Sequence, residues 1–75
     1  MAKAAKRLFI CLNNVGYEGS LERRKIYVAL PEAKAERARC LRIIDESGED
    51  YLYPSQRFVA ADLPVSTRRA VLQAA

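Results

Sequence analysis

The sequence contains neither histidine nor tryptophan, and its 75 residues include only two cysteines, three glycines and three prolines. Histidine is the commonest general base and the commonest metal ligand, so its absence removes the usual means of acid–base and metal-dependent catalysis. Without a histidine partner, neither cysteine can be activated as a nucleophile in the usual way. We therefore expect a protein that is not an enzyme and has no catalytic residue, no cofactor and no metal site.

Long hydrophobic runs are also missing. The first apolar run covers only residues 8–12, whereas a signal peptide needs about 7–15 apolar residues and a membrane span about 20. Cys11 and Cys40 stand alone in separate apolar stretches, while small secreted domains usually carry several cysteine pairs. We expect no membrane partner, two reduced and buried cysteines, and a cytoplasmic protein.

The residues that are present are typical of one small globular domain, with 51% hydrophobic and 29% charged residues. The formal net charge is +4, and it is unevenly distributed. Residues 1–42 contain ten lysines and arginines against four acidic residues, whereas residues 43–75 contain three against five. An excess of positive charge raises nucleic acid, acidic proteins and membrane surfaces as possible partners, but small basic domains are also common without any polyanionic partner.

Alternating apolar stretches and turn residues predict five short strands. These strands are expected at residues 8–13, 24–30, 40–44, 51–53 and 58–61. A surface helix is predicted near 32–39, a turn or one 3₁₀ turn at 54–57, and a C-terminal helix at 67–74 with Ser66 as its N-cap. The predicted organisation is a flexible basic arm (1–7), a small barrel (8–62) and a helical tail (63–75).

A polar turn at residues 45–50 is predicted to join the third and fourth strands. Gly48 is placed where a positive φ is expected. The four carboxylates of this turn are expected to be solvated, which excludes the desolvated acid that catalysis needs.

Residues 51–59, Tyr-Leu-Tyr-Pro-Ser-Gln-Arg-Phe-Val, resemble the end of a Src-homology-3 (SH3) domain, in which a strand is followed by Pro-Ser-Asn-Tyr-Val. The long loop before Lys25-Ile26-Tyr27-Val28 lies where such domains place their ligand-contacting loop. The chain also resembles small uncharacterised bacterial proteins with the layout Gly-Lys-x-Tyr-x-Val, then Asp-x-Ser-Gly-Glu-x-Tyr-Leu-Tyr-Pro, then Phe. The resemblance covers residues 8–62 and implies a mainly β fold, an SH3-like small β-barrel.

This chain differs from SH3 domains in the residues that bind the SH3 ligand. SH3 domains bind proline-rich peptides through a ridge of aromatic side chains that includes a tryptophan. This chain has no tryptophan, and only Tyr53, Pro54 and Phe58 match the ridge position by position. The resemblance therefore supports the fold more than proline-rich peptide binding.

Seven residues are candidates for binding a partner. Tyr17, Tyr51 and Tyr53 offer rings that could stack on nucleic-acid bases or pack in a protein interface. Arg23 and Arg24 form a basic group with the lysine that follows them. Arg68 and Arg69 lie at the start of the predicted C-terminal helix, where they could bind an anion or pair with an acidic neighbour such as Asp62.

These observations favour a non-catalytic protein-interaction or adaptor module with an unidentified protein partner. A small basic nucleic-acid-binding protein is the alternative. Basic groups and tyrosines gathered on one face would favour nucleic acid, whereas an apolar groove near Tyr53 would favour a peptide or protein. The sequence leaves the oligomeric state open.

Overall fold

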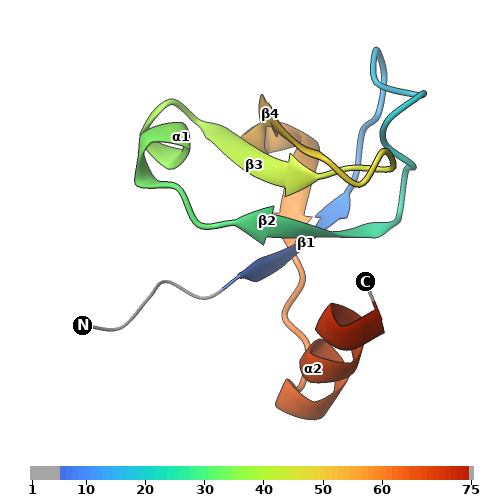
Figure 1. Cartoon of the computed structure of the whole chain (residues 1–75). Helices are drawn as coiled ribbons and strands as arrows, with labels where there is room; N and C mark the ends of the chain where they lie inside the picture. The colour runs from blue at the N-terminus through green and yellow to red at the C-terminus, as the bar shows by residue number, and fades with distance from the viewer. Residues whose placement is uncertain (1–5, 75) are drawn as a thin grey trace.

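One five-stranded antiparallel sheet organises the chain (Figure 1). The structure is a computed structural model that describes residues 6–74. The strand order is β4-β3-β2-β1-β5, so β4 and β5 form the two edges of the sheet. The strands are β1 (Arg7–Cys11), β2 (Ile26–Leu30), β3 (Cys40–Ile44), β4 (Asp50–Pro54) and β5 (Phe58–Ala60). The sheet curls into a half-barrel, which confirms the predicted fold class of a mainly β, SH3-like small barrel.

Three short helical elements connect or follow the strands. They are α1 (Ala33–Arg37), the 3₁₀ turn η1 (Ser55–Arg57) and α2 (Val65–Ala74). The prediction of Ser66 as an N-cap is wrong, because α2 begins at Val65 and Ser66 lies within its first turn. Met1–Ala5 of the predicted arm lie outside the described residues, and Arg7 belongs to β1. Within residues 6–74, no helix combines the length and the apolar character needed to cross a membrane.

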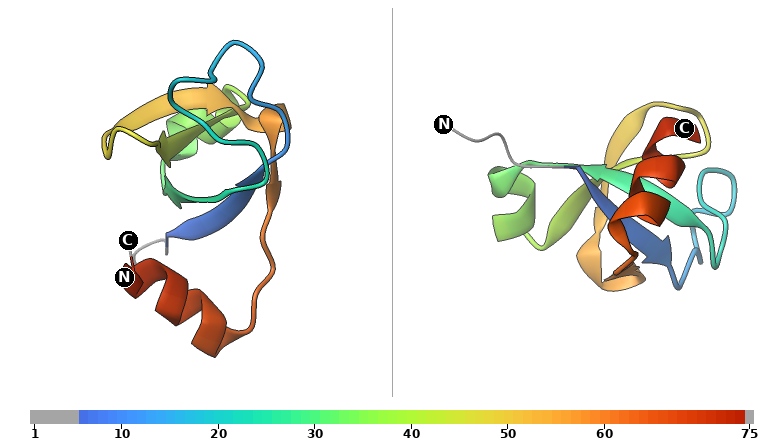
Figure 2. Two further views of the ribbon diagram at one scale, coloured as in Figure 1. Left: turned by 90° about the vertical axis from the view of Figure 1, so that its right-hand side faces the viewer. Right: turned by 90° about the horizontal axis from the view of Figure 1, so that it is seen from below.

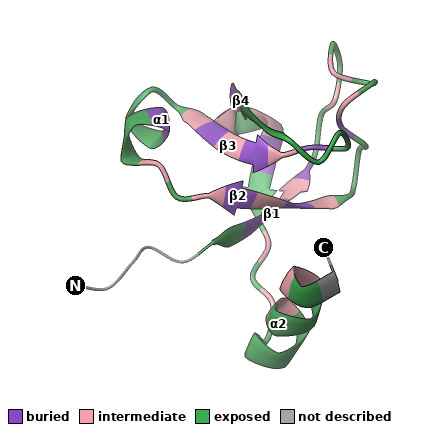
Figure 3. Ribbon diagram, viewed as in Figure 1, coloured by how far each residue is buried: buried purple, intermediate pink, exposed green. Residues whose placement is uncertain are grey.

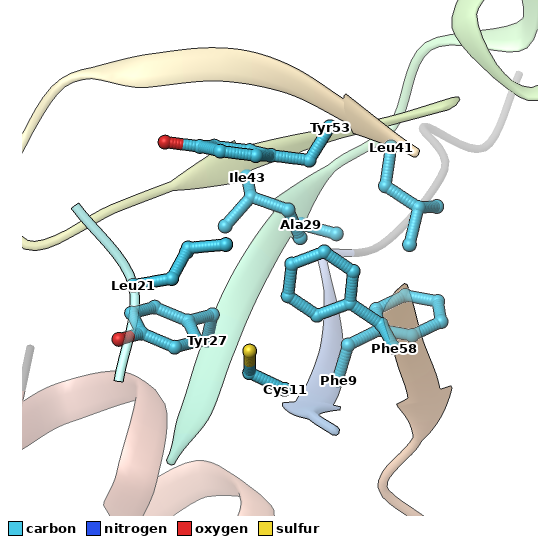
Figure 4. Packing of buried hydrophobic residues seen from close by; sticks show 9 residues of the cluster. All are labelled: Phe9, Cys11, Leu21, Tyr27, Ala29, Leu41, Ile43, Tyr53 and Phe58. Carbon is cyan, nitrogen blue, oxygen red and sulfur yellow. The ribbon is translucent and has the colours of Figure 1, made fainter. Parts of the chain in front are cut away.

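The inner face of the curled sheet holds the core (Figure 4). Side chains alternate between the two faces of a strand, so every second residue of β1, β2 and β3 points inward. The long loop between β1 and β2 contributes Leu21, which is fully buried. The core cluster consists of Phe9, Cys11, Leu21, Tyr27, Ala29, Leu41, Ile43, Tyr53 and Phe58.

The outer face of the sheet is also largely apolar. Leu8 pairs with Val28 and Ile10 pairs with Ile26 on this face, and α2 lies beside it (Figure 2). An open groove with a volume of about 400 Å³ separates Val71 of α2 from the sheet. Most of α2 remains exposed (Figure 3), so the helix covers this face only in part.

Candidate interaction surfaces

Tyr17 and Tyr53, two of the predicted binding residues, belong to an internal aromatic cluster. Their ring centroids are 5.0 Å apart in an edge-to-face arrangement, and Phe58 packs on the other side of Tyr53 at 6.3 Å. The side chain of Tyr53 is only 4% exposed. The prediction that Tyr53 contacts a partner is therefore corrected, because its ring is part of the core.

Arg57 covers the same cluster from outside. Its guanidinium carbon lies 5.1 Å from the centre of the Tyr17 ring, a distance typical of a cation–π interaction. Its Nη1 donates hydrogen bonds to the carbonyl oxygen of Val15 (2.7 Å) and to Oδ1 of Asn13 (3.1 Å). The long loop is thereby held against the 3₁₀ turn.

Asp45 corrects the expectation that all four carboxylates of the hairpin turn are solvated. Its side chain is buried, with 6% of its surface exposed. Oδ1 accepts hydrogen bonds from the backbone N–H and the hydroxyl group of Ser47, and Oδ2 accepts one from Tyr53. Burial alone would raise the pKa of Asp45, but the hydrogen bonds from Ser47 and Tyr53 outweigh it and hold the pKa below its ordinary value. The carboxylate is therefore structural and stays ionised.

A second polar cluster joins the start of β2 to the same hairpin. Glu46 accepts a hydrogen bond from the Tyr27 hydroxyl group (2.5 Å) and forms an ion pair with Lys25 (2.7 Å). The hydrogen bonds from Lys25 and Tyr27 lower the pKa of Glu46. Burial and the bond to Glu46 raise the pKa of Tyr27. The charge of Lys25 is thus partly neutralised by Glu46.

The two cysteines differ in their surroundings. Cys11 is fully buried on the inner face, and burial raises the pKa of its thiol. Cys40 is only half-buried, which corrects the expectation that both cysteines are buried. Within residues 6–74, no group of three or more histidine, cysteine or acidic residues is arranged to hold a metal ion.

The predicted basic groups do not form one surface. Arg23 and Arg24 precede β2, whereas α1 with its own cations follows β2, so the two groups lie at opposite ends of the sheet. Arg24 adopts a positive φ of 72°, a backbone conformation that is unfavourable for residues other than glycine.

Arg68 and Arg69 lie in α2, but they do not pair with Asp62. Among the ion pairs of the described residues, none involves these two arginines. Arg68 instead donates a hydrogen bond to the backbone carbonyl of Lys6. This contact attaches the first half of α2 to the start of β1.

Tyr51 is the one predicted tyrosine that is exposed, together with its neighbour Leu52. The two side chains are 51% and 50% exposed. They occupy the middle of β4, which is an edge strand. Tyr51 lies among carboxylates, since its hydroxyl group is 3.5 Å from Glu49 and Asp50 precedes it.

The backbone of β4 is open at Leu52, a feature that the sequence-based analysis missed. The backbone N–H of Asp45 donates to the carbonyl of Glu49, and the backbone N–H of Ser55 donates to the carbonyl of Arg39. In the register of β3 and β4, these bonds make Asp45–Glu49 and Arg39–Ser55 hydrogen-bonded pairs. In an antiparallel pair, hydrogen-bonded and non-hydrogen-bonded positions alternate. The register Arg42↔Leu52 is therefore a non-hydrogen-bonded pair, and both the N–H and C=O groups of Leu52 point away from β3.

The middle of β4 lacks the features that usually protect an edge strand. Edge strands are usually protected by lysine, proline, a bulge or a covering loop. The middle of β4, Tyr51-Leu52-Tyr53, carries no charge and no proline, and no backbone hydrogen bond from elsewhere in residues 6–74 reaches Leu52. The absence of a lysine from this strand is the signal in the sequence that could have indicated an open edge.

No protein family, curated protein or solved structure matches this chain.

Proposed function

We propose that the protein is a non-catalytic interaction module that binds an extended segment of a partner protein as an additional strand beside β4. The observation that carries the proposal is the open backbone of Leu52, in the middle of an edge strand where the side chains of Tyr51 and Leu52 are exposed. In strand addition, backbone hydrogen bonds supply affinity, and alternate side chains supply specificity.

The side chains around Leu52 suit such a ligand. Leu52 lies on the outer face of the sheet, next to Arg42, while Tyr51 lies on the opposite face. A strand added beside β4 would place alternate side chains against Leu52 and Tyr51. A segment with apolar residues at alternate positions would bury both exposed side chains.

A protein partner is preferred over nucleic acid because of what surrounds the exposed ring. Tyr51 is next to Asp50 and its hydroxyl group is close to Glu49, and carboxylates repel the phosphates that accompany a stacked base. Two free cysteines, one fully buried, fit a reducing compartment. The proposal therefore includes a bacterial cytoplasmic setting, without a cofactor and without catalysis.

The test uses peptides selected from a displayed random library for binding to the folded protein. Amide hydrogen exchange is then measured with and without a selected peptide. We expect exchange at Leu52 to slow by about tenfold or more, because its N–H gains a partner. The amide of Tyr53, which is already bonded within the sheet, should change little.

Two variants at the same position provide the control. Leu52→Pro removes only an N–H that makes no bond within the sheet, and proline is tolerated at such edge positions. It should abolish peptide binding while the protein remains folded, whereas Leu52→Thr retains the N–H and should keep part of the binding. The proposal would be contradicted by peptides that bind Leu52→Pro as tightly as they bind the unmodified protein. Peptides that slow amide exchange at other residues and not at Leu52 would contradict it too.

A further inference from the structure

Positive charge gathers at the end of the sheet where β1 begins and α1 lies. Arg7 is paired in register with Ala29 at the end of β2, and its guanidinium is 3.9 Å from Glu36 of α1. These contacts bring the start of β1 and α1 together. The cations that share this end, which we call the basic end, are Lys6, Arg7, Lys34, Arg37 and Arg39, and all are exposed.

Few carboxylates neutralise the basic end. Glu36 lies within ion-pair distance of Arg7 only, and Glu32 is engaged by Arg42 at 2.8 Å. Among the described residues, the other four cations of the basic end form no ion pair. The hairpin turn, at the opposite end of β3, carries the carboxylates of residues 45–50. The hairpin carboxylates therefore lie away from the basic end, at the end of the sheet that also carries Arg23, Arg24 and Lys25.

Arg39 is the residue that points to a ligand. It follows the C-terminal cap of α1 with a positive φ of 58°, at a position where glycine is strongly favoured. Its backbone carbonyl accepts a hydrogen bond from Ser55, a bond that any residue could make. Within residues 6–74 its guanidinium makes no hydrogen bond and no ion pair. An arginine kept in an unfavourable conformation without an internal partner is a candidate for external contact. Arg24 shares both features, but it lies at the hairpin end of the sheet, whereas Arg39 lies among the cations of the basic end.

We infer that the basic end binds a carboxylate-rich segment of a protein, with Arg39 as a principal contact. Guanidinium groups bind carboxylates through paired hydrogen bonds. Single-stranded nucleic acid is disfavoured because no exposed ring lies at this end on which a base could stack. The exposed Tyr51 is in β4, among hairpin carboxylates, and Tyr17 lies under Arg57. This surface is separate from the open β4 edge, so the inference goes beyond the proposed function and does not depend on it.

The test measures the binding of a fluorescent oligoglutamate peptide, with an RNA duplex and a single-stranded RNA as competing probes. The full chain is compared with Arg39→Asn, because asparagine tolerates a positive φ but carries no charge. Arg24→Asn is the matched control, since Arg24 has the same kind of backbone conformation at the other end of the sheet. Arg39→Lys tests whether a cation alone is sufficient.

We expect both asparagine variants to melt at the same or a higher temperature than the unmodified protein, because each relieves an unfavourable arginine conformation. Only Arg39→Asn should weaken peptide binding, by about threefold to fivefold at low salt, and Arg39→Lys should restore part of the loss. Equal losses with Arg24→Asn, or no loss with either variant, would show nonspecific attraction and overturn the inference. Absence of peptide binding, or tighter binding of either RNA that is lost in Arg39→Asn, would overturn it as well.

Discussion

The hydroxyl group of Tyr53 donates a hydrogen bond of 2.7 Å to Oδ2 of Asp45, and both side chains are buried. The same hydroxyl group lies 2.9 Å from the side-chain oxygen of Ser20 in the long loop. One phenol therefore connects β4, the hairpin turn and the loop between β1 and β2. The distant long loop is held to the same hairpin by a second contact, in which the backbone N–H of Glu46 donates to the carbonyl of Ser20.

Replacing Tyr53 with phenylalanine should destabilise the protein by about 1–3 kcal/mol, because Asp45 is left as a buried acceptor without one of its donors. Chemical denaturation followed by circular dichroism measures the change. Tyr51→Phe is the control, since that hydroxyl group is exposed and should contribute less than about 0.5 kcal/mol. Equal effects of the two substitutions would contradict the structural role of the Tyr53 hydroxyl group.

Stability should fall in acid because Asp45 and Glu46 both have lowered pKa values in the folded protein. In the unfolded chain their pKa values return to the ordinary range, so below about pH 5 the unfolded state binds more protons and the free energy of unfolding decreases. Denaturation midpoints measured from neutral to acidic pH test this. In Asp45→Asn, the free energy of unfolding should decrease less steeply with falling pH. If the pH dependence is unchanged in this variant, other carboxylates cause the acid sensitivity.

Gly48 has a φ of +85°, which confirms the predicted left-handed position in the hairpin turn. Gly48→Val should destabilise the protein by about 1 kcal/mol or more through the backbone alone, because no atom lies within 4 Å of the position of an added Cβ. Gly19→Ala is the matched control, with equally open space and no positive φ. The melting temperatures of the two variants are compared. Equal melting temperatures would contradict the left-handed conformation of Gly48.

The two cysteines should react with a thiol probe at different rates. Cys11 is fully buried and burial raises the pKa of its thiol, so its reaction requires unfolding. Cys40 is half-buried and should be labelled first. Mass spectrometry of the native protein should therefore show one rapid modification, which Cys40→Ser removes. Two rapid modifications would mean that the inner face opens easily.

Local patterns in the sequence were sufficient to predict most of the fold. Gly48 between two apolar runs predicted the hairpin, and Pro54-Ser55-Gln56-Arg57 predicted the 3₁₀ turn, because each depends on residues that are neighbours in the chain. The predicted β3, residues 40–44, has the bounds that the structure shows. Helix ends were less accurate, since Ser66 resembles an N-cap but lies inside α2.

Contacts between distant segments could not be predicted in the same way. The burial of Asp45 depends on Tyr53 and Ser20, and no local pattern distinguishes it from the solvated carboxylates beside it. The internal packing of Tyr17 likewise depends on Arg57, which lies in another segment. The open backbone of Leu52 follows from the hydrogen-bond register between β3 and β4, which a sequence does not specify by itself.

The length of β4 also limits growth by self-association. An added strand would present a new edge of its own on its far side, and repeated addition is how fibrils elongate. β4, however, spans only Asp50–Pro54, and the chain then turns directly into η1. The proline carries no N–H to continue the pairing. A strand added at this edge can therefore pair over only a few residues, so we expect it to favour a short segment of a partner.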